Sequence, residues 1–310
     1  MDSTIRIPVV LFFFIVIFVT GVPSNILALY TFLVKVRQKP TPVGILLLNL
    51  TISDLLLLCL LPFKMVEAAS DMHWPMPFIL CPIVAMACFC SIYLSVLFLT
   101  AVSVERYLGV TFPIKFKVNR NTSYTVGACC LIWICTAFQG SILFFDLEFL
   151  PSNDTSEGTC NINFSEEQLY IILPYRLECF IVLFCIPFLI TTFCYVNFVR
   201  VLMSMPNIGR RKKYRAIGLA VATLCNFVIC FAPFNISHII GFIQRQSPYW
   251  KVYTLLLSSL NASLDPIVFY YSSNAVQRAF ANCARGIRMK LTALCASANC
   301  SARDQYDIGV

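Results

Sequence analysis

Residues 43–66 read VGILLLNLTISDLLLLCLLPFKMV and decide what kind of fold the chain adopts. The run exceeds the about 20 apolar residues that a helix needs to cross the hydrocarbon core of a bilayer. Apolar residues would cover every face of such a helix, so no polar stripe remains to meet water. Asp54 nevertheless stands at its centre. Ionisable side chains inside a membrane are costly and usually functional, so Asp54 is the first candidate site residue.

The composition of the whole chain agrees with this membrane assignment. The 310 residues are 59% hydrophobic and only 12% charged, with a mean hydropathy of +0.79. Soluble domains carry about 25% charged residues, so this chain has too few polar groups to cover a water-facing surface. No CxxC…CxxC pattern or Cys/His metal spacing occurs, and most of the 16 cysteines are expected to be small buried hydrophobes.

Six further apolar runs have the length of a membrane span, and each is bounded by polar, charged or proline-rich residues. The seven predicted spans are residues 7–34, 43–66, 78–110, 124–145, 171–203, 216–242 and 252–271. The first run is too long for a signal peptide and a basic cluster follows it, so it is expected to remain as a span. The predicted fold is therefore an all-α membrane protein, with a seven-helix transmembrane domain at residues 1–271.

Lysine and arginine residues set the predicted orientation of the spans. They are concentrated in the links after spans 1, 3 and 5 and in the tail, whereas the other links are poorer in them. The basic residues of these segments are Lys35, Arg37, Lys39, Lys115, Lys117, Arg120, Arg210, Arg211, Lys212, Lys213, Arg215, Arg278, Arg285, Arg288 and Lys290. Because basic links stay in the cytoplasm, the amino terminus is expected outside and residues 272–310 inside. The net charge of +8 then belongs at the inner membrane face and does not indicate a nucleic-acid partner.

The tail begins with SSNAVQRAF, residues 272–280, in which a cap-like Ser/Asn pair precedes an amphipathic stretch. This pattern predicts a short helix that lies on the inner membrane face. Cys283 and Cys295 beyond it are candidate sites of palmitoylation, although free cytosolic thiols are an equally good interpretation.

Each predicted span also carries a polar, aromatic or proline residue at a distinctive place. A Glu-Arg-Tyr triplet ends span 3, span 6 contains CFAP, and an aspartate precedes a proline in span 7. In chain order the set is Asn25, Asp54, Glu105, Arg106, Tyr107, Trp133, Pro187, Tyr195, Phe231, Pro233, Asp265 and Pro266. One such feature is weak, but the ordered set covers the whole chain and resembles the rhodopsin-like (class A) G-protein-coupled receptors. The resemblance implies a receptor rather than an enzyme, and no nucleophile–base pair stands together in the spans.

The resemblance implies an activation switch at the inner side of the bundle. Arg106 is expected to pair with Glu105 in a closed state and, once released, to meet a cytoplasmic partner. The other residues implied in this switch are Tyr107, Phe231, Pro233, Tyr195, Asp265 and Pro266. Two positions depart from the family pattern, because Phe231 stands where a tryptophan is common and Phe269 where span 7 usually has a tyrosine. The hydroxyl group of Tyr195 is therefore expected to lack its usual partner.

Further sites follow from the same resemblance. It implies an allosteric sodium ion, and no other cofactor, in the middle of the bundle; a buried hydrogen-bond network with water is the alternative. The oxygen ligands would come from Asp54, Ser95, Asn261 and Asp265. A disulfide between Cys81 and Cys160 is plausible because both fall on the oxidising outer side. Asn153 and Asn163 begin sequons in the outer loop and are candidates for glycosylation.

Three basic residues are expected near the outer ends of spans 5, 6 and 7. Arg176 lies 11 residues before the proline of span 5, which is about 16 Å along a helix. His238 lies five residues beyond the proline of span 6, and Lys251 lies 15 residues before that of span 7, again toward the outside. A small carboxylate would satisfy this basic trio, because the fork of an arginine matches a carboxylate with two hydrogen bonds.

Each member of the trio also has a plainer interpretation. Lys251 follows Tyr249-Trp250, and its side chain would then snorkel to lipid headgroups. His238 would be a satisfied buried polar residue. Arg176 would pair with Glu178 or Glu67.

Local strings around these residues resemble the free fatty acid receptors that sense short-chain carboxylates. The strings are LPFKMVEAA (61–69), HWP (73–75), SVERYLGV (103–110), LPYRLE (173–178), PFNISH (233–238) and SSLNASLDP (258–266). The resemblance implies that the carboxylate binds Arg176 and His238, with Lys251 in place of a second arginine. It also implies three pocket residues: Tyr93, Gln139 where a histidine is often found, and Phe234 where a tyrosine is often found.

The implied ligands are acetate, propionate and butyrate, and the implied partners in the plasma membrane are a heterotrimeric G protein, arrestin and membrane lipids. A receptor for another small anion or for a longer fatty acid would use the same basic trio. A carboxylate transporter or channel is the alternative of a different class, but transporters usually show internal repeats and this chain shows none.

Overall fold

The computed structural model describes residues 3–71, 73–77, 79–113, 122–149, 166–206, 208–245, 248, 250–272, 276–283, 285–286 and 288–289. The described part of the chain is built from long helices joined by short links. Their order is α1 (Ser3–Gln38), α2 (Pro42–Ala69), α3 (Leu80–Thr111), α5 (Thr122–Phe149), α6 (Glu166–Cys179), η2 (Phe180–Cys185), α7 (Ile186–Ser204), α8 (Arg210–Gln244) and α9 (Lys251–Ser272).

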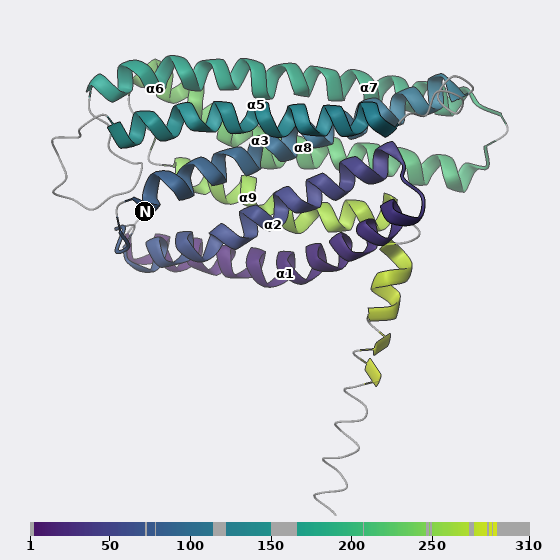
Figure 1. Ribbon diagram of the computed structural model, residues 1–310, viewed down its shortest axis with the longest axis horizontal. Coiled ribbons are helices and arrows are strands. Elements are labelled where there is room, and N and C mark those ends of the chain that lie inside the picture. The colour runs from purple at the N-terminus through teal and green to yellow at the C-terminus, as the bar shows by residue number, and fades with distance from the viewer. Residues whose placement is uncertain are drawn as a thin grey trace, which may run out of the picture.

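Seven stretches of these described helices are long and apolar enough to cross a membrane, which confirms the predicted fold. They lie on α1, α2, α3, α5, the continuous series α6–η2–α7, α8 and α9. Figure 1 shows the helices running side by side along the long axis of the molecule. The ends of the bundle are called outer and inner below, as the distribution of basic residues predicts.

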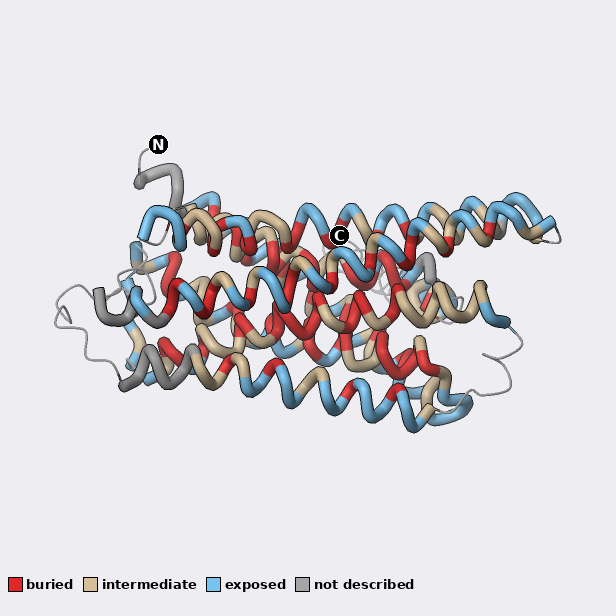
Figure 2. The backbone as a smooth tube through the Cα atoms, turned by 90° about the horizontal axis from the view of Figure 1, so that it is seen from above, coloured by how far each residue is buried: buried red, intermediate tan, exposed pale blue. Residues whose placement is uncertain are grey.

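The bundle is packed as lipid requires, with apolar side chains outside and with an apolar interior that also encloses the buried polar residues. Large side chains such as Phe138 and Leu189 are each 67% exposed. Asn25, Asp54 and Asp265 are buried, and Figure 2 shows the buried residues gathered in the interior of the bundle. Because a bilayer core offers no hydrogen bonds, polar groups must find partners within the protein.

The fifth span is interrupted by one widened turn, η2 at residues 180–185, where the helix takes π geometry. Pro187 lies two residues after its last residue, Cys185. A proline has no N–H for the preceding turn, and its ring collides with the carbonyl group of that turn in a regular α-helix. The wider turn accommodates this conflict by inserting one extra residue into the helix. It changes the helical register between α6, which carries Arg176, and α7, which carries Tyr195.

Residues 276–283 form the short helix predicted for the tail, and Figure 1 shows it running across the direction of the spans. Val276 is completely buried against the bundle, and Phe280 meets Tyr270 of α9 edge to face, with their ring centroids 5.9 Å apart. Arg278 lies on the exposed side. This tail helix therefore has the apolar and polar faces of a helix at a membrane surface.

Candidate functional site

The basic trio converges at the outer end of the bundle from three different elements. Arg176 on α6 is 5% exposed and His238 on α8 is 3% exposed, whereas Lys251, the first residue of α9, is half-buried. The positive charges of Lys251 and Arg176 are close enough to the imidazole of His238 to interact with it electrostatically. Arg176 and Lys251 are likewise close enough to repel each other. The structure thus brings these three predicted residues into one neighbourhood.

His238 is the most unusual member of this group. Neither of its ring nitrogens hydrogen-bonds to another described residue, although the side chain is buried. Its ring instead meets that of Phe234 at 4.7 Å between centroids, with the planes 72° apart. A buried polar group without a partner costs roughly 1–3 kcal/mol. His238 is therefore oriented by an aromatic neighbour while its polar atoms stay available.

Tyr93 of α3 is fully buried beside the trio, and the charge of Arg176 reaches it. Its hydroxyl group donates a hydrogen bond to Oδ1 of Asn235 at 2.9 Å. The amide of Asn235 in turn donates to the carbonyl oxygen of Phe231 at 2.9 Å, which anchors it in α8. This chain of bonds fixes the Tyr93 ring between α3 and α8. Asn235 was not among the predicted site residues, although an asparagine six residues from the centre of the predicted span 216–242 is the kind of signal that marked Asp54.

Gln139 of α5 donates through Nε2 to Oε1 of Glu178 at 2.9 Å. Its backbone oxygen accepts a hydrogen bond from the hydroxyl group of Tyr175 at 2.6 Å, while its side-chain oxygen Oε1 has no hydrogen-bond partner among the described residues. Glu178, which the plainer interpretation paired with Arg176, is thus bonded to Gln139.

The second proposed partner of Arg176 is also engaged elsewhere. Glu67 is 3% exposed and forms a 2.8 Å salt bridge with Lys64, one turn earlier on α2. The ammonium group of Lys64 also lies 5.7 Å from the centre of the Trp74 ring, a cation–π contact. Because the charge of Lys64 acts on Lys251, this pair borders the basic trio. Two opposite charges three residues apart at the end of a span are a sequence signal for this pair, which was not among the predicted site residues.

A second polar centre lies in the middle of the bundle. Asp54 and Asp265 are 1% and 0% exposed, and their carboxyl groups interact with each other. The hydroxyl group of Ser95 donates to Oδ1 of Asp54 at 3.3 Å, and Nδ2 of Asn261 donates to Oδ2 of Asp265 at 2.9 Å. The four residues predicted for a sodium site are thus in one place. Two buried carboxylates this close need a proton or a cation between them.

Asn226 of α8 completes this mid-bundle centre and was missed by the sequence analysis. Its amide donates to Oδ1 of Asn261 at 2.6 Å and to Oδ1 of Asp265 at 3.2 Å. Oδ2 of Asp54 is buried and accepts no hydrogen bond from the described residues. The oxygens of the four predicted ligands, Asp54, Ser95, Asn261 and Asp265, are hard donors of the kind that metal cations without soft character prefer. No group of three or more His, Cys, Asp or Glu residues that could hold a metal occurs in the described chain.

At the inner end, Glu105, Arg106 and Tyr107 close α3, and all three are partly buried. The ring of Tyr107 meets the exposed Phe193 of α7 edge to face at 5.9 Å. Tyr107 also packs against a cluster of buried residues that includes Tyr195. These contacts join the inner ends of α3 and α7.

The hydroxyl group of Tyr195 is buried and has no hydrogen-bond partner among the described residues. Phe269, which stands where the family has a tyrosine, packs edge to face on Phe32 of α1 at 5.5 Å. These contacts agree with the expectation that Tyr195 lacks its usual partner in the seventh span.

The remaining switch residues belong to the packed centre of the sixth and seventh spans. Phe231 is fully buried and meets Phe227 edge to face at 5.5 Å, and Phe227 stacks on Phe184 of the widened turn. Pro233 and Pro266 lie inside α8 and α9. An aromatic series thus connects α8, close to the ligand-binding candidates, with the π turn of the fifth span.

The predicted covalent modifications are only partly within the described residues. Cys81 is buried at the start of α3 and is disulfide-bonded, whereas Cys160, its predicted partner, lies outside the described residues. Asn153, Asn163 and Cys295 also lie outside them, so glycosylation at the first two and palmitoylation at the third remain predictions. Cys283 is an exposed free thiol on the tail helix.

Comparison with known proteins gives one consistent answer. Residues 24–269 match the family described as 7 transmembrane receptor (rhodopsin family). The chain is 48% identical over 272 residues to free fatty acid receptor 2 of Mus musculus, an alignment that covers 86% of this chain and 82% of that one. It is 44% identical over 270 residues to free fatty acid receptor 3 of Mus musculus (86% and 84% covered) and 43% identical over 274 residues to that of Homo sapiens (86% and 77% covered).

These relatives are receptors and not enzymes, and the seven apolar helices make the chain a multi-pass protein of the plasma membrane. The chain belongs to the rhodopsin family of seven-transmembrane receptors and is related within it to free fatty acid receptors 2 and 3.

Proposed function

We propose that this receptor is activated by short unbranched carboxylates, such as acetate, propionate and butyrate, which bind at the basic trio. The observation that carries the proposal is the buried imidazole of His238, which has no hydrogen-bond partner among the described residues and lies beside Arg176 and Lys251. A carboxylate would supply acceptors to this donor-rich region. The printed names of its relatives, free fatty acid receptors, support the same ligand class.

The three groups would divide the work of recognition. Arg176 would bind the carboxylate with its planar fork, Lys251 would add a second positive charge, and His238 would donate one hydrogen bond. Tyr93 and Phe234 would pack around the short alkyl chain. The free energy of binding of a very small ligand reaches at most about −1.5 kcal/mol per non-hydrogen atom. Acetate would therefore bind with no more than about −6 kcal/mol, which sets the lowest dissociation constant on the order of 10⁻⁵ to 10⁻⁴ M.

Ligand binding would bias a two-state bundle. A carboxylate that bridges α6, α8 and α9 contacts elements that continue to the inner end, and His238 lies one turn beyond Pro233, where α8 can bend. Movement of α8 would expose Arg106 and the basic start of α8 to a heterotrimeric G protein, and afterwards to arrestin. The ligand shifts the equilibrium only by as much as it binds the open state better.

A sodium ion, if bound, would lie at the mid-bundle centre and neutralise the two buried carboxylates. Asp54, Asp265, Ser95 and Asn261 would hold it. These residues come from α2, α3 and α9, and Asn226 adds α8, so the centre ties together the helices that would move.

The test is G-protein activation in cells that express the full chain, recorded against unbranched carboxylates of increasing length. Arg176→Ala is compared with Arg245→Ala, an exposed arginine at the outer end of α8. Surface expression is measured for both variants. We expect Arg176→Ala to lose at least about 100-fold in potency, because a charge-assisted hydrogen-bonded pair contributes roughly 3 kcal/mol. Arg245→Ala should respond like the wild type.

Two results would overturn parts of this proposal separately. A wild type that reaches the surface but does not respond to any short carboxylate at millimolar concentration removes the ligand class. A response that survives Arg176→Ala keeps the ligand class and moves its binding site away from the basic trio.

A further inference from the structure

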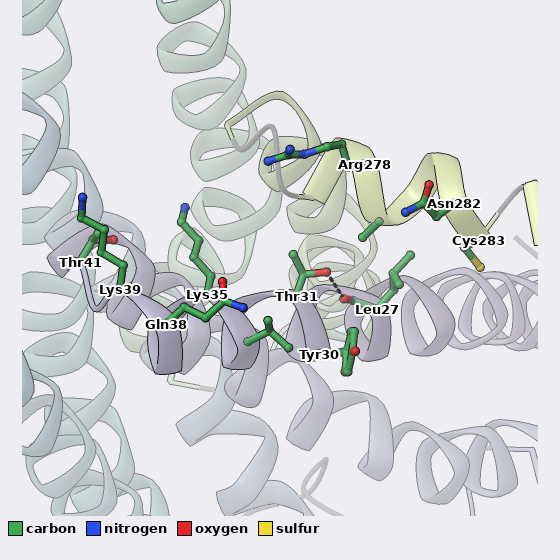
Figure 3. Close-up of a pocket in the computed structure, with 12 residues that line it drawn as sticks. Leu27, Tyr30, Thr31, Lys35, Gln38, Lys39, Thr41, Arg278, Asn282 and Cys283 are labelled. Carbon is green, nitrogen blue, oxygen red and sulfur yellow. Dashed lines mark hydrogen bonds between the residues drawn. The ribbon is translucent and has the colours of Figure 1, made fainter.

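A groove of about 800 Å³ opens on the surface of the inner half of the bundle, between α1, its link to α2 and the tail helix (Figure 3). Its wall along α1 is apolar over Leu27, Tyr30 and Val34, and Ala279 faces them from the tail helix. Tyr30 is among the most exposed large side chains of the bundle. In a membrane, this wall lies at the depth of the acyl chains of the inner leaflet.

The cytoplasmic end of the groove is cationic. Lys35, Lys39 and Arg278 line it, and the described residues that line the groove include no Asp or Glu. Figure 3 shows the amino groups of Lys35 and Lys39 on the side of α1 where the tail helix lies, and the guanidinium group of Arg278 pointing toward them. Lys39 and Arg278 are exposed. The basic residues thus gather where α1 leaves the membrane.

We propose that this groove is a binding site for one anionic phospholipid of the cytoplasmic leaflet. The phosphate group would lie between Lys39 and Arg278, and an acyl chain would run along α1 to Leu27. From Leu27 to Gln38 the helix rises about 16 Å, which matches the roughly 15 Å hydrocarbon thickness of one leaflet. The change from apolar to cationic lining along this length matches the amphipathic shape of a lipid better than that of a protein segment.

Charge selects the class of lipid. The cytoplasmic leaflet carries the anionic lipids, and each lysine or arginine near its surface contributes about 1 kcal/mol of attraction. A zwitterionic lipid would gain little of this, so an anionic headgroup should be preferred. A bound lipid would contact α1 and the tail helix together and hold the tail helix against the bundle.

The experiment is native mass spectrometry of the full-length receptor in a neutral detergent, titrated with dioleoylphosphatidylserine or dioleoylphosphatidylcholine. We expect tighter binding of phosphatidylserine, and a loss of about fivefold for Lys39→Gln and for Arg278→Gln, the equivalent of about 1 kcal/mol each. The matched controls are Arg210→Gln and Arg211→Gln, exposed cations at the inner start of α8 and outside the groove. Glycerophosphoserine, the headgroup without acyl chains, should not compete at equal concentration.

Three kinds of result would overturn the proposal, two of them because something other than an anionic lipid fills the groove. Thermal unfolding checks that all variants are folded. Equal affinity for the two lipids, or equal losses in the groove and control variants, overturns the proposal. So does a dimer that excludes phosphatidylserine, because a second receptor copy then fills the groove. An intact mass that shows an acyl group on Cys283, with lipid binding that appears only in Cys283→Ser, would mean that the chain fills the groove with its own palmitate.

Discussion

The outer and mid-bundle polar centres are both buried in a membrane domain, but they treat their polar atoms in opposite ways. In the middle, Asn226, Asn261 and Ser95 supply hydrogen bonds to Asp54 and Asp265, and Oδ2 of Asp54 is the exception. At the outer end, cations gather around a histidine with no hydrogen-bond partner among the described residues. Unsatisfied polar groups are expensive in a bilayer. The mid-bundle centre is thus a network bonded largely within the protein that joins helices, whereas the outer centre leaves the polar atoms of His238 without partners among the described residues.

The largest expected effect tests whether the bonds of the mid-bundle network stabilise the fold. Asn226→Leu removes the donor to both Asn261 and Asp265, so the free energy of unfolding should fall by about 3 kcal/mol. In detergent this corresponds to a Tm lower by about 6–12 °C. Asn197→Leu is the matched control, because among the described residues the side-chain amide of Asn197 donates to the backbone of its own helix, at Phe193. Equal Tm values for the two variants would show that the network does not stabilise the fold.

The next prediction concerns the opposite property of the outer centre. His238→Phe should weaken carboxylate potency by about 30-fold, or about 2 kcal/mol, because it removes a hydrogen-bond donor to the ligand. It should leave the Tm of the ligand-free receptor unchanged or higher, because a buried imidazole without a partner is removed. His73→Phe, on the exposed outer link, is the control. A lower Tm with normal potency would make His238 a structural residue.

A smaller effect should reveal whether sodium couples the two centres. In wild-type membranes, replacing sodium with choline should change the affinity for propionate by about fivefold, or about 1 kcal/mol. Asp54→Asn keeps the shape of the side chain but removes one charge of the proposed ion site, so this dependence should vanish. Asp71→Asn, exposed on the link after α2, should keep it. Sodium dependence that persists in Asp54→Asn would place the ion elsewhere.

The smallest expected effect tests whether Lys251 contributes to carboxylate binding at the outer centre. Lys251→Arg supplies a second planar fork, and we expect potency to rise about threefold, or about 0.6 kcal/mol. Lys251→Gln should lower it, because a positive charge is lost. Dose–response curves for acetate at matched surface expression measure both. If both variants have the acetate potency of the wild type, Lys251 does not contact the ligand. Its side chain would then point to lipid headgroups, and Arg176 and His238 would hold the carboxylate.

The fold was predictable because lipid imposes a simple rule on the chain. A span such as residues 43–66 needs only sufficient length and apolarity, both of which are read along one dimension. The helices nevertheless extend beyond several predicted limits, as α1 does from Ser3 to Gln38 where residues 7–34 were expected. Helix ends at a membrane surface depend on caps, such as the 3.1 Å bond that Oγ1 of Thr41 accepts from the amide of Gly44.

The candidate site was predictable only as a set of residue types. Arg176, His238 and Lys251 could be assigned to the outer end by counting from prolines, and the structure places them together. The bonds between Asn226 and Asn261, or between Tyr93 and Asn235, depend on how each helix is rotated toward its neighbours. That rotation is set by the packing of all seven spans. Polar residues inside a span are the signal that would have marked both asparagines.

The widened turn at residues 180–185 has a consequence for how this receptor can diverge. Because it places α6 and α7 in different registers, a substitution that restored a regular helix there would turn Arg176 by about 100° around the axis relative to Tyr195. If acids bind as proposed, changes in the outer half of the span would alter which acid is preferred while the inner surface stays as it is. The ligand preference and the choice of cytoplasmic partner would then be able to evolve independently, although one span carries residues of both proposed sites.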